Sequence, residues 1–309
     1  MIENKPPGSN QSSPHFCAQS LQPQSHMNSS VTQANIIRVK GNSQKEETDF
    51  LATEEPLEIR LMFGKKEARK QQSVSVTMRT PGHDFDLAAG FLFTEGIIQS
   101  DDDIQSIRYC SDLNNNVIRV ELEEDVSVNI IKLERNFYTT SSCGVCGKAS
   151  IDAVRTVCRL QKQETEEAQF PAEVLITLPD VLRKTQSVFE NTGGLHGCAL
   201  FDRNGNLILS REDVGRHNAV DKLVGAAMQN GLFPLHNYLL LLSGRASFEL
   251  VQKAAMAAIQ MVAAVGAPSS LAVQMATEAG ITLVGFLRNG GFNIYTNANR
   301  ILVSNGITV

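Results

Sequence analysis

The chain lacks several features that mark common classes of protein. Its longest apolar stretches, 238–242 and 254–265, are too short or too interrupted by polar residues for a membrane-spanning helix of about 20 residues. It has no long block of basic residues, and its formal net charge of -5 gives no general field that attracts a polyanion. Neither Gly-x-x-x-x-Gly-Lys nor Gly-x-Gly-x-x-Gly occurs. These absences argue against a membrane-spanning protein, a nucleic-acid partner, ordinary ATP hydrolysis and dinucleotide-dependent dehydrogenation.

The N-terminus shows no export signal. Its first residues are rich in Ser, Gln, Asn and Pro, and they lack a charged segment followed by an apolar one. We therefore expect a cytoplasmic protein in which the 6 cysteines are reduced. In that compartment, closely spaced cysteines serve catalysis or metal binding more often than structural disulfides.

The most informative motif is a pair of cysteines separated by two residues, Cys143 and Cys146, in the sequence CGVCG. Hydroxyl side chains at 139–142 precede the pair, and apolar residues recur at helical spacing after it, which predicts a helix that begins at the motif. The positive end of this helix and the nearby Lys148 favour a thiolate. We expect Cys143 to be reactive.

The same spacing also occurs in structural zinc sites, which need about four ligands. No second Cys-x-x-Cys exists, and the other cysteines are scattered singly: Cys17, Cys110, Cys158 and Cys198. His15 and His26 lie near Cys17 in the polar N-terminal segment, where such residues occur by chance. We assign no metal ligand, and a structural metal at the cysteine pair stays an open alternative.

Composition and periodicity divide the chain into three parts. Residues 1–48 contain too little apolar surface to offset the entropy of ordering and are expected to form a disordered tail. Residues 49–165 are expected to form an α+β subdomain that carries the Cys-x-x-Cys loop. Its predicted elements are strands at 56–61, 73–78, 104–109 and 117–122 and a helix at 84–98. A polar connector at 161–169 marks the boundary.

Residues 166–309 are expected to form an α/β subdomain that binds a cofactor. A helix is predicted from Thr177 to about Gly193, followed by a hairpin, 195–201 with 207–210, around Asn204-Gly205. Further predicted elements are helices at 216–229, 248–265 and 271–279 and strands at 238–242, 281–286 and 292–295. The predicted fold is a three-layer α/β sandwich with a mixed sheet, with the smaller N-terminal subdomain beside it.

Four loops at the ends of predicted strands carry polar groups where ligands of α/β sheets gather: 191–197, 212–218, 243–245 and 288–291. The glycine-rich loop 191–197 is also typical of a helix end and turn, and loop 212–218 of a capped helix with a solvated face. Arg216, Arg245 and Arg288 combine guanidinium groups with flexible backbone, which suits phosphate. Together these loops predict a pocket for an anionic, hydrogen-bonding ligand such as a nucleotide or phosphate.

Six motifs occur in a fixed order along the chain. They are EPL (55–57), RTPGHD (79–84), SSCGVCG (141–147), GGLH (193–196), EDVGRHNAVDK (212–222) and SGRASFE (243–249). In this order they resemble the formate dehydrogenase accessory sulfurtransferase family, FdhD, over about residues 55–300. The resemblance implies a cytidine-deaminase-like fold. It also implies a sulfur carrier that receives sulfur from a cysteine desulfurase and delivers it to the bis(molybdopterin guanine dinucleotide) molybdenum cofactor, for use by formate dehydrogenase.

The resemblance further implies which residues act. Cys143 would bear the persulfide, and Cys146 would be a second thiol on the same loop. The family's cofactor-binding stretch matches Phe286, Leu287, Arg288, Asn289, Gly290 and Gly291, in which Arg288 is the only charged residue. Guanine dinucleotides need cations at the pyrophosphate and carboxylate or amide groups at the guanine edge. These types are supplied by Arg216, Arg245, Asp213 and Asn218, so the expected ligand is guanine nucleotide-like.

Two alternative functions belong to different classes. A zinc-dependent nucleobase deaminase would carry His-x-Glu and Pro-Cys-x-x-Cys. This chain has Ser142 before Cys143, and none of its histidines has Glu two residues later, so deaminase activity is not expected. A chaperone that holds the molybdenum cofactor without transferring sulfur stays open. We also expect a homodimer, because the apolar helix predicted at 248–265 can pack at an interface, although it can equally be core.

Overall fold

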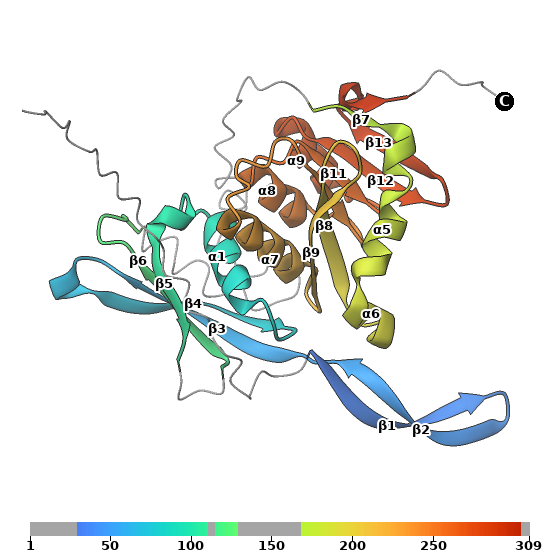
Figure 1. The fold of residues 1–309 in the computed structure, drawn as a ribbon, viewed down its shortest axis with the longest axis horizontal. Coiled ribbons are helices and arrows are strands. Elements are labelled where there is room, and N and C mark those ends of the chain that lie inside the picture. Colours follow the sequence, from blue (N-terminus) through green and yellow to red (C-terminus); the bar gives the residue numbers. More distant parts are fainter. Residues whose placement is uncertain (1–29, 111–114, 129–167, 304–309) are drawn as a thin grey trace, which may run out of the picture.

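The described chain begins with a β-hairpin that projects from the body of the protein (Figure 1). The structure is a computed structural model that describes residues 30–110, 115–128 and 168–303. Strands β1 (Val31–Lys40) and β2 (Ser43–Ala52) pair antiparallel along their whole length. The expectation of a disordered tail is therefore wrong for residues 31–48, because backbone pairing orders a segment that buries few side chains.

A four-stranded sheet follows, in the spatial order β4-β3-β6-β5. Its strands are β3 (Glu55–Phe63), β4 (Lys70–Arg79), β5 (Ile104–Tyr109) and β6 (Val117–Leu122). They confirm the four strands predicted from alternation, and Leu57, Ile59 and Leu61 point from β3 into the core. Helix α1 (Asp84–Thr94) covers this sheet and ends earlier than predicted, since Gly96 takes the left-handed conformation that ends helices.

The second sheet has six strands in the order β13-β12-β11-β10-β8-β9. They are β8 (His196–Phe201), β9 (Leu207–Asp213), β10 (Leu239–Leu242), β11 (Met261–Ala264), β12 (Thr282–Arg288) and β13 (Gly291–Thr296). The three central strands β10, β11 and β12 run parallel, whereas β8, β9 and β13 are antiparallel to their neighbours. The sheet is therefore mixed, as predicted.

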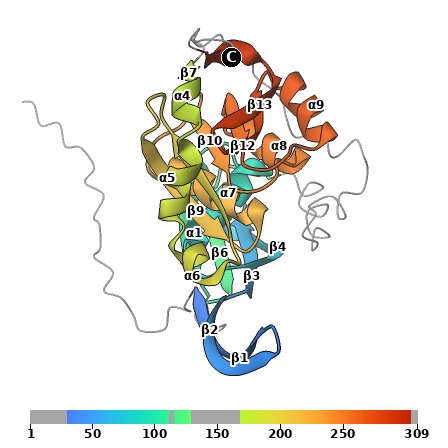
Figure 2. The ribbon, with the colours of Figure 1, turned by 90° about the vertical axis from the view of Figure 1, so that its right-hand side faces the viewer.

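Helices cover both faces of this sheet (Figure 2). On one face lie α4 (Ala172–Leu175) and α5 (Leu178–Thr185), packed on Leu239 and Leu241; α6 (Ser187–Thr192) continues from α5. The other face carries α7 (Arg216–Gln229), α8 (Phe248–Met256) and α9 (Ser270–Glu278), packed on Leu240 and Leu242. This alternation along β10 explains its continuous apolar sequence and gives the predicted three-layer sandwich.

Short elements complete the described chain. They are the strands β7 (Phe170–Pro171) and β14 (Ile301–Leu302), which pair in parallel, and the 3-10 turns Lys66–Ala68, Asp101–Asp103 and Ala298–Arg300. No helix in the described ranges is long and apolar enough to cross a membrane.

Two predicted helices differ from the structure. The helix expected at 248–265 ends at Met256, and its last residues form the buried strand β11. The chain turns between them at Ala258, which has a φ of 59°. This left-handed conformation is uncommon for alanine, so the sequence does not predict the turn. The helix expected from Thr177 is interrupted at Gln186, which separates α5 from α6.

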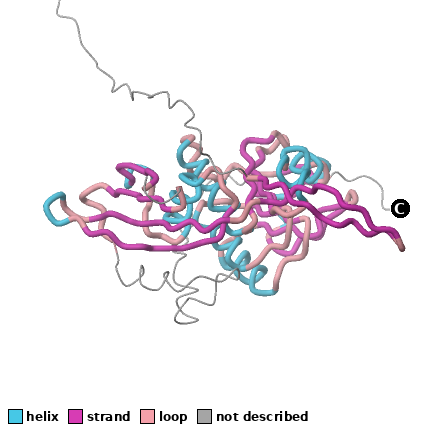
Figure 3. Tube along the Cα trace, turned by 90° about the horizontal axis from the view of Figure 1, so that it is seen from below, coloured by secondary structure: helices cyan, strands magenta, loops and turns pink. Residues whose placement is uncertain are grey.

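Helices α1 and α7 join the two sheets through a close crossing, and Figure 3 shows the helices between the strands of the two halves. A Cβ atom at Gly90 of α1 would lie 1.9 Å from the backbone oxygen of Asp221, and one at Gly225 of α7 would lie 2.0 Å from that of Asp86. Only glycine permits this approach. One hydrophobic core runs from the four-stranded sheet through α1 and α7 to the six-stranded sheet.

Candidate anion-binding edge of the six-stranded sheet

Strands β10, β11 and β12 end at the same edge of the sheet, where β8 begins and β9 leads into α7. We call this region the carboxyl edge and define it by His196, 213–217, 243–249 and 265–268. Its loops are joined by backbone hydrogen bonds. Ser243 N donates to Gly197 O (2.9 Å), Gly266 N to Gly244 O (2.9 Å) and Phe286 N to Gly266 O (3.0 Å). The loops at this edge are therefore joined by their backbone into one layer, at the end of the sheet where ligands of α/β proteins gather.

Cationic side chains gather at the carboxyl edge. Arg216 is the first residue of α7, and Arg245 is exposed in the loop after β10. Burial, together with the charges of Arg216, His217 and Arg245, lowers the pKa of His196, so its imidazole is neutral at neutral pH. Arg216 and Arg245 both act on the charge of His196, so they lie in one region, and their binding of a shared anion stays a prediction. This local positive field suits an anion despite the negative net charge of the chain.

One carboxylate lies within this cationic region. Glu249, in the first turn of α8, has Oε2 at 3.8 Å from Nε2 of His217. Burial favours the neutral acid, but polar contacts with His217, Ser247 and the backbone outweigh burial and lower the pKa of Glu249 to about 2. Glu249 is therefore an anion throughout the physiological range. The sequence analysis did not assign His217 or Glu249 to the site. The available signal was that they belong to the motifs 212–222 and 243–249, each of which follows a strand.

Asp213 and Asn218 face inward instead of toward a ligand. Asp213 is 0 % exposed, and both of its carboxylate oxygens are engaged. Oδ2 pairs with Lys222 Nζ (2.7 Å) and accepts from Thr80 N (3.1 Å), while Oδ1 accepts from Gly215 N (2.8 Å) and from Asn218 Nδ2 (3.1 Å). Asn218 Nδ2 also donates to the backbone oxygen of Met78 (2.7 Å). Both side chains fix the start of α7, and thereby the position of Arg216.

The stretch 286–291 forms the turn between β12 and β13, as predicted. Asn289 and Gly290 both have positive φ, 55° and 75°, which is the conformation that a two-residue hairpin turn requires. Leu287 is buried in the core, whereas Phe286 and Arg288 point to the outer face with their side chains in contact. Phe286 has a φ of 53°, which is rare for an aromatic residue and marks a bulge beside Gly266. Three of the six predicted ligand residues, Phe286, Arg288 and Asn289, thus have side chains exposed to solvent.

The cysteine pair lies outside the described residues, as does the predicted helix after it. In the described part of the chain, no three His, Cys, Asp or Glu side chains are grouped so as to hold a metal ion. The described thiols are Cys110, which is partly buried, and Cys198, which lies in β8 with its pKa raised by burial. Cys198 is therefore a core residue with an unreactive thiol.

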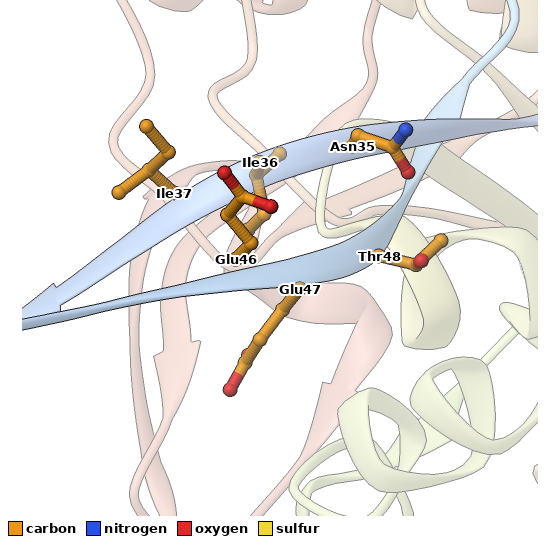
Figure 4. A pocket seen from close by; sticks show the side chains of 6 residues that line it. All are labelled: Asn35, Ile36, Ile37, Glu46, Glu47 and Thr48. Atoms are coloured by element: carbon orange, nitrogen blue, oxygen red, sulfur yellow. The ribbon is translucent and has the colours of Figure 1, made fainter.

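A hollow on the projecting hairpin shares no residue with the carboxyl edge (Figure 4). It lies along the twisted strands β1 and β2 and is lined by Asn35, Ile36, Ile37, Glu46, Glu47 and Thr48. It contains two carboxylates and no cation, so it does not suit the anionic ligand predicted for the chain.

Comparison with known proteins relates residues 52–302 to the FdhD/NarQ family, whose model matches this range. The chain is 53% identical over 272 residues to the Sulfur carrier protein FdhD of Streptomyces coelicolor, covering 86% of this chain and 94% of that protein. It is 41% identical over 271 residues to the Sulfur carrier protein FdhD of Saccharolobus solfataricus, covering 88% and 98%. A crystal structure from Desulfotalea psychrophila, provisionally named a formate dehydrogenase accessory protein, has a TM-score of 0.66 at 23% identity and covers 88% of this chain and 99% of its own. That structure shows that the fold is shared.

Proposed function

This chain belongs to the FdhD/NarQ family, and we propose that it is a sulfur carrier for the bis(molybdopterin guanine dinucleotide) molybdenum cofactor. In this proposal a cysteine desulfurase supplies the sulfur, the protein carries it in the cytoplasm, and formate dehydrogenase receives the sulfurated cofactor. The observation that carries the proposal is the match to relatives named as sulfur carriers over nearly their whole length. The range matched by the family model, 52–302, spans both the cysteine pair and the carboxyl edge.

The proposed sulfur transfer is an exchange between thiolates. The Cys143 thiolate attacks the outer sulfur of a persulfide on the desulfurase, a new sulfur–sulfur bond forms on Cys143, and the desulfurase leaves as a thiolate. The step involves no net oxidation or reduction. Cys146, separated from Cys143 by two residues in the sequence, is the proposed second thiol that protects or releases the bound sulfur. The carrier therefore acts as a sulfurtransferase.

The carboxyl edge is the proposed place of the cofactor. Arg216 and Arg245 provide guanidinium groups for the pyrophosphates, which guanidinium binds through paired hydrogen bonds. Phe286 offers an exposed ring, and Arg288 lies 5.5 Å from its centre, so a guanine base can stack beside a cation. Asp213 and Asn218, whose polar atoms are engaged within the protein, act in this proposal by positioning α7 and Arg216.

Mass spectrometry of the intact protein tests the sulfur step. After incubation with a cysteine desulfurase and cysteine, the wild type is expected to gain the mass of sulfur at Cys143, and Cys143→Ala is expected to gain none. Cys198→Ala is the matched control and should load like the wild type, because its thiol is buried in β8. Absence of added sulfur on wild-type Cys143, together with binding of guanosine diphosphate, would favour the chaperone that carries cofactor without sulfur.

A second experiment tests the ligand site. Arg288→Ala should weaken binding of guanosine diphosphate by about 10-fold to 100-fold, since hydrogen bonds to charged groups contribute about 1.5–3 kcal/mol, and should leave sulfur loading unchanged. Arg183→Ala is the matched control, because Arg183 also lies over a phenyl ring, that of Phe189 in α6, away from the carboxyl edge. Equal affinities of the wild type and Arg288→Ala would remove the 286–291 turn from the site.

We also propose that the protein is a homodimer joined through its hairpins. The helix first considered for the interface, α8, has most of its residues in the core. The hairpin instead presents Ile37, Val39 and Phe50 on one face, exposed by 62%, 65% and 46%. An isolated two-stranded ribbon is marginally stable in water, and a twofold axis would place this apolar row of one copy against the same row of the other.

A further inference from the structure

Charge is segregated along the projecting hairpin β1–β2 (Figure 1). The tip, residues 38–45, has only cations among its charged side chains: Arg38, Lys40 and Lys45. The root, residues 48–55, joins the hairpin to the body and has only carboxylates: Asp49, Glu54 and Glu55. Residues 31–37 carry no charge, and Glu46 and Glu47 lie between the tip and the root. The hairpin is therefore positive at one end and negative at the other.

Contacts within one copy leave charge available at both ends of the hairpin. Glu47 is held by the tip itself, since its carboxylate lies 2.7 Å from Nε of Arg38 and 3.3 Å from Nζ of Lys45. In the described part of the chain, Lys40 at the tip and Glu54 at the root form no ion pair, and both residues are exposed. A partner with the opposite charges at the matching spacing can pair with both ends.

The pairing of the strands fixes where each side chain lies along the hairpin. Val39 lies opposite Gln44 near the tip, Phe50 lies opposite Gln33 near the root, and Ile37 lies between them on the same face. A twofold axis midway along this apolar row sets Val39 of one copy against Phe50 of the partner subunit. The two hairpins then run antiparallel, with the tip of each at the root of the other. The charged ends border the apolar contact as a polar rim.

A second copy of this chain is the partner that fits the charge pattern. An isologous contact brings the same surface of two copies together, so a surface that is positive at one end and negative at the other complements itself. A uniformly acidic or uniformly basic partner would attract one end of the hairpin and repel the other.

The root lies beside the loop that leads into the carboxyl edge. Strand β2 packs on α6, and a Cβ atom added at Gly194 would lie 3.4 Å from Cβ of Ala52. His196, two residues after Gly194, belongs to the carboxyl edge. A tip that docks at the root of the partner subunit therefore reaches the side of the molecule from which loop 193–195 enters the carboxyl edge.

We propose that the basic tip of each hairpin docks at the acidic root of a second copy, beside loop 193–195. The inference rests on the homodimer proposed above and assigns its register. The apolar row supplies contact area, and the charged ends select the antiparallel arrangement, because a parallel one would bring tip against tip and root against root. Exposed ion pairs are screened by salt, so the dimer should weaken as the ionic strength rises from about 0.05 M to about 0.5 M.

Charge reversal in complementary variants tests this register. The tip variant carries Lys40→Glu and Lys45→Glu, and the root variant carries Asp49→Lys and Glu54→Lys. In each variant like charges meet at both ends of the dimer, so sedimentation equilibrium should show a dissociation constant raised about tenfold or more. A mixture of the two variants should regain a dimer of near wild-type affinity, because every tip then meets a root of opposite charge. Restored association also establishes that both variants are folded.

The matched control is Lys65→Glu combined with Lys66→Glu, two exposed lysines in the turn before β4, which should leave the dissociation constant unchanged. If both hairpin variants dimerise like the wild type, the assigned register is wrong while a hairpin dimer stands. If the variants dissociate and their mixture does not associate, docking of tip on root is likewise wrong. If the wild type is a monomer, the proposed homodimer itself fails, and sulfur loading of Cys143 is measured independently of this result.

Discussion

The buried pair of Lys222 and Asp213 gives a quantitative test of how the carboxyl edge is held. Lys222 is 1% exposed, and its Nζ lies 2.7 Å from Asp213 Oδ2 and donates to Thr80 O at 2.8 Å. Lys222→Met removes the cation but keeps most of the side-chain volume. Breaking a buried pair by removing one partner costs about 3–5 kcal/mol, because the other charge is left uncompensated. We therefore expect Lys222→Met to lower the free energy of unfolding by about 3–5 kcal/mol, a large part of the total of about 5–15 kcal/mol that is usual for a folded protein.

Urea unfolding followed by far-ultraviolet circular dichroism measures the effect, since the chain has 0 tryptophans and 4 tyrosines for fluorescence. With a denaturant slope of about 3 kcal/mol/M, the midpoint should fall by about 1 to 1.7 M. Lys184→Met, at an exposed position of α5, is the matched control and should change the stability by about 0.5 kcal/mol or less. Asp213→Asn combined with Lys222→Met should recover part of the loss, because no buried charge then stays unpaired.

The pH dependence of the same variant has a defined sign. Burial raises the pKa of Asp213, and the charge and hydrogen bond of Lys222 oppose this increase. A carboxyl group whose pKa is raised on folding destabilises the folded state only above its unfolded pKa of about 4, and increasingly so as the pH rises. Without Lys222 the opposing effect is lost, so the deficit of Lys222→Met should be larger at about pH 7 than at about pH 4. A midpoint equal to that of the wild type at both pH values would refute this account of the pair.

Three further predictions concern other parts of the molecule. Gly225→Ala should lower the free energy of unfolding by about 1–3 kcal/mol or more, because the added Cβ would meet the backbone of Asp86. Gly194→Ala is the control and should lower it less, because an added Cβ there has no contact shorter than 3.4 Å. Equal unfolding midpoints of the two variants would contradict the close crossing of α1 and α7. Ile37→Asp should convert the proposed dimer to a monomer, as light scattering measures. Ile176→Asp, which replaces another exposed isoleucine, is the control and should leave the dimer intact. A monomeric wild type would exclude the dimer. Cys198 should resist iodoacetamide until the protein is unfolded, as mass spectrometry of labelled peptides reports, and rapid native labelling would contradict its burial.

The layered fold was predictable because its signals are local. Alternation along β3 and the unbroken apolar run of β10 each reflect which faces of the strand are buried. Strand β11 gave no such signal, since its four residues continue the apolar pattern of α8 and the turn between them depends on the backbone of Ala258. Hairpin β1–β2 was missed for the opposite reason. Its order comes from backbone pairing between strands that bury few side chains, so it leaves no burial pattern in the sequence.

The location of the candidate site was predictable, but the direction of its side chains was not. Loops that follow strands converge at one edge, so Arg216 and Arg245 were expected to meet. Nothing in the sequence distinguishes Asp213, whose carboxylate is fully engaged inside the protein, from Glu249, which lies among the cations of the edge. The difference arises from partners distant in sequence, Thr80 and Lys222 in the first case and His217 in the second.

Much of the family resemblance is carried by residues whose partners lie inside the protein. Motif 79–84 meets motif 212–222 at Thr80, which makes three hydrogen bonds to it. The backbone N–H of Thr80 donates to the Asp213 carboxylate, and its backbone carbonyl accepts from Lys222. The hydroxyl of Thr80 accepts from the backbone N–H of Val214. The start of α7 is therefore fixed by the N-terminal half, and the placement of Arg216 depends on both halves. Membership of a motif consequently does not by itself indicate contact with a ligand. Within 212–222, the side chains of Arg216 and His217 lie at the carboxyl edge, and they are the groups of this motif on which ligand recognition should depend.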